Sequence, residues 1–162
     1  MVSTRSVLLT VNVAGVLAVA AVLAAQSGEP LFGTWKIVPE KSTYSPGPAP
    51  KTNTKKYEPY KGGLKAQQDS VTAAGEKRHV EVTASFDGKD YPGTGNPEVD
   101  TYAFQRIDAH NYVVTQKKDG KVTITSKMTI APDGNTRVVN QSGKDYKGRP
   151  VNNSVFWEKV KQ

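Results

Sequence analysis

The sequence predicts an all-β protein whose strands close into a single antiparallel up-and-down β-barrel, with a two-sheet β-sandwich as the alternative. Three observations support this fold class. Apolar and polar side chains alternate with a period of two along several short runs after residue 28. Turn-forming residues separate these runs at short intervals. Beyond the N-terminal segment, no stretch carries the helical period that a crossover between parallel strands requires.

The N-terminal residues 1–27 predict a signal peptide. They begin with the basic Arg5, continue as an apolar run over 7–25, and end in small residues around Ala24 and Ser27. We expect cleavage near 24–27 and a β-barrel domain over 28–162, in the periplasm or secreted. The alternative is an uncleaved membrane anchor, because the apolar run lies near the lower length limit of a spanning helix.

Composition narrows the function classes. The 162 residues contain no cysteine, which excludes disulfides, thiol catalysis and cysteine metal sites. The formal net charge is +7, and most of the excess is lysine scattered singly, as on solvated faces and protected sheet edges. An anionic envelope surface remains an expected partner class. Nucleic acid is not expected, because no basic cluster is interleaved with aromatic residues. We expect a monomer.

Nine runs qualify as strands, over residues 31–38, 52–60, 64–73, 78–86, 101–107, 112–118, 121–130, 136–142 and 151–160. Residues 39–50 between the first two contain four prolines, which lack the donor that a sheet needs, and predict a long flap. Within 78–86, Val80, Val82 and Phe86 share one face. Asp119-Gly120 predicts a tight hairpin, after which Val122, Ile124 and Met128 share one face.

Residues 86–100 are dense in glycine, proline, asparagine and aspartate, and predict the central connection of the fold. Their segment Gly88-Lys89-Asp90-Tyr91 recurs as Gly143-Lys144-Asp145-Tyr146. One interpretation is a pair of similar turns. The other is a paired contact surface that uses Tyr91 and Tyr146.

Phe32-Gly33-Thr34-Trp35 resembles the Gly-x-Trp signature that opens lipocalin and related calycin barrels. The resemblance implies that Trp35 plugs one end of the barrel, that Gly33 allows a close backbone approach, and that the flap lies at the open end. It also implies that both Gly-Lys-Asp-Tyr segments lie at the plugged end. Residues 41–48 and 86–92 resemble a family of uncharacterised exported bacterial proteins, and this second resemblance carries no activity.

The residues offer little for catalysis, and we expect no enzyme activity, no cofactor and no metal site. The chain has two histidines: His79 lies with Glu81 on the polar face of a predicted strand, and His110 lies in a turn. A metal site needs three or four convergent ligands.

Arg106 is the candidate anchor for a ligand. It follows Tyr102 and Phe104 at two-residue spacing, so all three project from one face of a strand. If this face points inward, a ligand carboxylate would satisfy the guanidinium bidentately, which is similar to the anchoring in fatty-acid-binding calycins. The alternatives are a solvated Arg106, with Ala103, Gln105 and Ile107 inward, and an inward Arg106 that stacks on Trp35.

These observations predict a non-catalytic barrel that binds a small apolar or amphipathic ligand, hydrophobic or carboxylated. The expected wall residues are Val80, Val82, Phe86, Tyr102, Phe104, Arg106, Val122, Ile124, Met128 and Trp157. The alternative is a protein- or envelope-interaction module with a self-filled barrel, which would use Tyr44 of the flap, Tyr91 and Tyr146 as contact groups. Interior volume distinguishes the two.

Overall fold

The computed structural model describes residues 28–161, so the predicted signal peptide, residues 1–27, lies outside the described part of the chain. Within the described residues, no helix is long and apolar enough to span a membrane.

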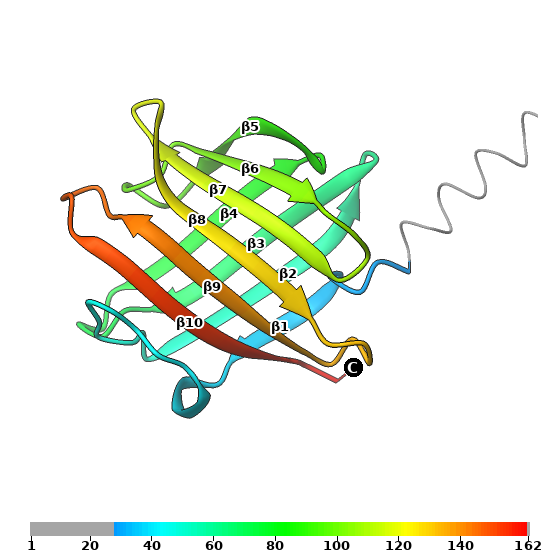
Figure 1. The fold of residues 1–162 in the computed structure, drawn as a ribbon, viewed down its shortest axis with the longest axis horizontal. Coiled ribbons are helices and arrows are strands. Elements are labelled where there is room, and N and C mark those ends of the chain that lie inside the picture. The colour runs from blue at the N-terminus through cyan, green and yellow to red at the C-terminus, as the bar shows by residue number, and fades with distance from the viewer. Residues whose placement is uncertain (1–27, 162) are drawn as a thin grey trace, which may run out of the picture.

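Ten antiparallel strands form one closed barrel, in which each strand pairs with its neighbours in sequence and β1 pairs with β10 (Figure 1). The strands are β1 (Gly33–Ile37), β2 (Thr52–Tyr60), β3 (Gly63–Val71), β4 (Lys77–Ala84), β5 (Asp87–Thr94), β6 (Thr101–Arg106), β7 (Asn111–Lys118), β8 (Lys121–Ile130), β9 (Thr136–Lys144) and β10 (Pro150–Lys159). The short 3-10 helix η1 (Pro39–Lys41) follows β1. The predicted up-and-down barrel is confirmed, and the two-sheet sandwich is wrong.

The prediction of a central loop over 86–100 is wrong in its first half, because β5 occupies Asp87–Thr94. This strand is irregular: a bulge lies between Asp87 and Asp90, and the register with β4 contains two residue pairs. Gly93 lies in the strand for a packing reason. A Cβ there would come within 2.3 Å of the Tyr102 ring, so the glycine lets β5 pass close to that side chain.

Successive connections alternate between the two ends of the barrel. The loop after β1, residues 38–51, lies at one end, which we call the flap end (Figure 1). Trp35 lies toward the opposite end, where β1 begins and β10 ends, and we call this the plug end. The flap is fastened to β10 by backbone hydrogen bonds between Thr43 and Ser154. It is therefore part of the folded barrel.

β5 is absent from the nine strands expected from the sequence. This additional strand places each later connection at the end opposite to the one expected. The turn that contains Tyr146 joins β9 to β10 at the flap end, and Tyr91 lies within β5. The expectation that both Gly-Lys-Asp-Tyr segments lie at the plug end is therefore wrong. Tyr146 is 49% exposed, whereas Tyr91 packs against the core and donates a hydrogen bond to Asp87.

The plug is built from the start of the first strand. Trp35 is fully buried, and its indole Nε1 donates a 2.8 Å hydrogen bond to the carbonyl oxygen of Leu31, itself fully buried. Gly33 has a φ of +121°, a conformation that side chains with a Cβ rarely adopt. The local backbone therefore requires this glycine, and the indole it precedes fills the base of the barrel.

Candidate ligand site inside the barrel

The barrel contains an inner cavity of about 50 Å³. Its walls are mostly apolar and come from strands on all sides, with polar groups from Gln68, Gln116 and Ser126. The apolar and aromatic lining residues include Tyr57, Ala66, Val80, Val82, Tyr102, Phe104, Val114, Met128 and Val139. A space of this size holds a few water molecules or one small polar head group.

A second cavity of about 190 Å³ lies nearer the flap end, and we call it the mouth. It shares five lining residues with the inner cavity: Lys55, Gln68, Tyr102, Gln116 and Val139. The mouth adds Tyr44 of the flap together with Asn53, Asn96, Gln141, Val155 and Trp157. The shared residues make the two cavities neighbouring parts of one interior.

Arg137 of β9 is the most deeply buried charge of the site, at 1% exposure. Its guanidinium carbon lies 4.5 Å from the ring centroid of Trp35 and 4.8 Å from that of Trp157. One terminal nitrogen contacts Met128 Sδ at 3.4 Å. Within residues 28–161, its Nε and its other terminal nitrogen have no hydrogen-bond partner. Aromatic faces stabilise the charge but leave these donors unsatisfied.

Lys55 of β2 is a second cation of the interior. It lies opposite Trp35 in the ladder with β1, and its Nζ is 5.6 Å from the Trp157 ring centroid. Desolvation by burial lowers the pKa of Lys55, and the positive charge of Arg137 lowers it further. No aspartate or glutamate is among the described residues that line either cavity.

Tyr57 lies two residues beyond Lys55 on the same face of β2, and its ring centroid is 5.1 Å from the Arg137 guanidinium carbon. Burial alone would raise the pKa of the Tyr57 phenol, yet the charges of Lys55 and Arg137 lower it below its ordinary value. The interior therefore favours negative charge.

Further unsatisfied polar atoms line the mouth. Tyr44 Oη, Asn53 Oδ1 and Trp157 Nε1 are buried and have no hydrogen-bond partner within the described chain. Buried polar groups without partners are uncommon in folded proteins, because each costs about 1–3 kcal/mol. The mouth thus presents donors and an acceptor at which a polar ligand group could bind.

The structure places the sequence-predicted wall residues in different surroundings. Val80, Val82, Tyr102, Phe104 and Met128 line the inner cavity, and Tyr102, Trp157 and Tyr44 line the mouth. Val122 is 56% exposed. Phe86 packs near the plug end against Phe32 and Tyr112, and neither Phe86 nor Ile124 lines either cavity.

Arg106 lies outside both cavities. Tyr102 and Phe104 are buried, but β6 ends at Arg106, which is 45% exposed and places its Nε 3.3 Å from Glu29 Oε1. Glu29 is buried and also accepts a hydrogen bond from the Tyr112 hydroxyl. The interior arginine, stacked on Trp35, is instead Arg137, which sequence reasoning missed. Val138 and Val139 are consecutive and therefore point to opposite faces of β9, so the sequence does not indicate which face points inward.

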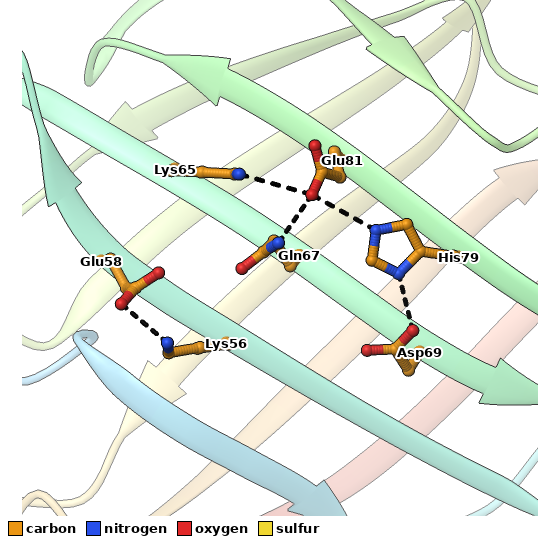
Figure 2. Close-up of polar contacts among 7 residues, drawn as sticks. All are labelled: Lys56, Glu58, Lys65, Gln67, Asp69, His79 and Glu81. Carbon is orange, nitrogen blue, oxygen red and sulfur yellow. Dashed lines mark hydrogen bonds and ion pairs between the residues drawn. The ribbon is translucent and has the colours of Figure 1, made fainter.

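The outer face of β2, β3 and β4 carries a polar network of its own, drawn in Figure 2. His79 Nδ1 lies 2.6 Å from Asp69 Oδ1, and its Nε2 lies 3.3 Å from Glu81 Oε1. Glu81 also accepts from Gln67 at 2.6 Å and pairs with Lys65 at 3.3 Å, while Lys56 pairs with Glu58 at 2.7 Å. Hydrogen bonds that His79 donates to the carboxylates of Asp69 and Glu81 raise the pKa of His79.

This network is a solvated surface ladder. His79 and Glu81 lie on the polar face, and the 54% exposed His79 side chain faces solvent. Within residues 28–161, no group of three or more histidine, cysteine or acidic side chains is arranged to hold a metal ion. We base the functional interpretation on the interior cavities. No protein-family model matches the chain, and no curated protein matches it in sequence.

Proposed function

We propose that the protein is a non-catalytic, lipocalin-like carrier that binds a small amphipathic anion inside the barrel. The observation that supports this is the pair of cations, Lys55 and Arg137, in a cavity whose described lining contains no carboxylate. A ligand anion, of which a carboxylate is the simplest case, would supply the missing counter-charge.

The energetic argument starts from the cost of a buried charge. Taking an ion out of water costs several kcal/mol unless a partner of opposite charge compensates. The cation–π contacts of Arg137 return about 2 kcal/mol when the site is desolvated. Its two unsatisfied nitrogens remain suited to a carboxylate, which accepts two parallel hydrogen bonds from a guanidinium.

The cavity volumes limit the size of the ligand. Pockets for drug-sized molecules occupy about 300–1,000 Å³, whereas the inner cavity and the mouth measure about 50 and 190 Å³. We propose that the anionic group lies in the inner cavity beside Arg137, that the rest of a short ligand extends into the mouth, and that the ligand enters at the flap end.

The resemblance to calycin barrels supports a carrier role. The closed up-and-down barrel, the Trp35 stopper and the flap at the opposite end are the arrangement that the Gly-x-Trp resemblance implies. Export through a cleaved signal peptide, to the periplasm or outside the cell, belongs to the same proposal, as does a role against an anionic envelope surface.

Isothermal titration with hexanoate and with neutral hexanol tests the proposal. We expect hexanoate to bind more tightly than hexanol, and Lys55→Gln and Arg137→Gln to weaken hexanoate by about tenfold or more, since a hydrogen bond to a charged group contributes about 1.5–3 kcal/mol. Arg106→Gln, at the plug-end surface, is the matched control and should bind like the wild type. Equal affinities for acid and alcohol would remove the anion site.

An interaction module is the second candidate, and the small volume of the inner cavity, about 50 Å³, supports it. The exposed Tyr146 turn at the flap end would then be part of the contact surface. Native mass spectrometry of protein purified from its own host separates the candidates. A co-purified small acid supports the carrier, and a bound protein without a small molecule supports the module.

A further inference from the structure

We propose that Lys55 is a covalent attachment site for carbonyl ligands, in which its amine forms an imine with an aldehyde that has entered the mouth of the barrel. This goes beyond the proposed carrier function. It uses the same interior but takes a ligand of different chemistry, held by a reversible bond.

The first observation is where Lys55 lies. It lines both the inner cavity and the mouth, so its amine is reachable from the flap end while its stem is held in the barrel wall. The side chain is half-buried. The Lys55 amine is therefore both inside the barrel and accessible to a ligand, and a nucleophile inside a barrel needs both properties.

The second observation is that Lys55 has no acidic partner. Within residues 28–161, it makes no ion pair, and the described lining of both cavities contains no carboxylate. Burial, the largest cause, and the nearby Arg137 charge lower the pKa of Lys55 and outweigh Tyr57, which favours the ammonium form. A lysine next to a second cation in a desolvated pocket is activated as a nucleophile, because only the neutral amine attacks a carbonyl.

Lys159 provides the contrast. Burial and Arg137 lower its pKa as well, but its Nζ donates a 2.7 Å hydrogen bond to the carbonyl oxygen of Pro30 and lies 4.8 Å from the Trp35 ring centroid. This ammonium is therefore held as a donor at the plug end. Lys117 and Lys118 are likewise paired, with Asp90 and Asp100.

The step balances without an oxidant or a reductant. The neutral Lys55 Nζ attacks the carbonyl carbon, a C–N bond forms, the carbonyl π electrons move to oxygen, and one proton passes from the nitrogen to that oxygen, giving a carbinolamine. The amine loses a proton, the hydroxyl leaves as water after it gains one, and the C=N bond forms. We assign the supply and recovery of that proton to Tyr57, which lines the inner cavity together with Lys55.

Reductive trapping tests the inference. Wild-type protein is incubated with hexanal and sodium cyanoborohydride near neutral pH, which reduces any imine to a stable secondary amine, and the modified lysine is identified by peptide mass spectrometry. We expect the Lys55 adduct to exceed the Lys159 adduct by about tenfold or more at early times, because only the neutral amine reacts.

Substitutions at Lys55, Lys159 and Tyr57 test the assignment of the adduct further. Lys55→Arg keeps the positive charge and should abolish the early adduct, whereas Lys159→Arg, the matched control, should leave it unchanged. Tyr57→Phe should slow adduct formation without moving the adduct to another lysine. If the exposed Lys36 and Lys121 are modified before Lys55, the inference is overturned. The distribution of adducts in the wild-type protein is sufficient to decide this.

The hexanoate titration keeps the two proposals separate. Hexanoate binding without a Lys55 adduct would remove the imine site and leave the anion carrier intact. A Lys55 adduct without hexanoate binding would support the imine site and remove the anion carrier.

Discussion

At the scale of single residues, an acidic partner distinguishes the surroundings of Arg106 from those of Arg137. Arg106 pairs with Glu29, whose buried carboxylate also accepts from Tyr112 and so fastens the segment before β1 to the plug end. Arg137 has aromatic rings for neighbours and no carboxylate within the described cavity lining. The same side-chain type thus serves as a surface clamp at one position and as the unpaired charge of an interior at the other.

His79 gives a prediction at this scale. Its pKa is raised by hydrogen bonds to Asp69 and Glu81, so it should titrate above the ordinary value of about 6.5. A raised folded-state pKa means that the stabilising contribution is fully present below the unfolded value and is lost as the pH rises through the folded value. Because the group is exposed, the effect on the free energy of unfolding should be small.

An NMR titration of the imidazole protons measures this pKa. Asp69→Asn should lower the pKa of His79 toward its ordinary value, since the largest cause of the shift is removed. Asp133→Asn, in the turn between β8 and β9, should leave it unchanged. An identical His79 titration in wild type and Asp69→Asn would contradict the role assigned to this hydrogen bond.

At the scale of elements, β5 is the strand that a search for alternation misses. Its segment is rich in the residues that mark turns, and its ladder is bulged, so the pattern of a loop and the pattern of this strand coincide. Strand number offers a signal that does not depend on side chains. An up-and-down barrel that closes with antiparallel pairs throughout needs an even number of strands, so nine candidates imply one more.

The site was predictable where alternation is clean. β4 and β6 carry apolar residues at every second position, and Val80, Val82, Tyr102 and Phe104 all line the inner cavity. β2 is polar on both faces, so nothing in its sequence marks Lys55 as an inward residue. The charged half of the site became visible only when the register between β1 and β2 placed Lys55 beside the plug.

Gly93→Ala tests why β5 contains a glycine. The added Cβ would meet the Tyr102 ring at 2.3 Å, so we expect a loss of about 1–3 kcal/mol in the free energy of unfolding, measured with urea. In a Tyr102→Ala background the clash disappears, and the same change should cost less, giving a clear coupling energy. Strictly additive costs would show that the contact with the Tyr102 ring is not the reason for the glycine.

At the scale of the whole molecule, closure removes the exposed strand edges through which open sheets associate. The β1–β10 ladder completes the ring, and exposed lysines such as Lys36 and Lys121 are spread over the outside. We therefore expect the barrel domain to remain a monomer at micromolar concentrations in analytical ultracentrifugation. A concentration-dependent dimer would instead point to an association surface outside the strand edges, such as the Tyr146 turn.

The crowding of rings around Arg137 has an optical consequence. The chain contains two tryptophans, Trp35 and Trp157, and both lie against the same guanidinium. All of the indole emission of this protein therefore originates within a few ångströms of its deepest cation. The barrel thus contains its own spectroscopic sensor, which responds to events at its centre without an added dye.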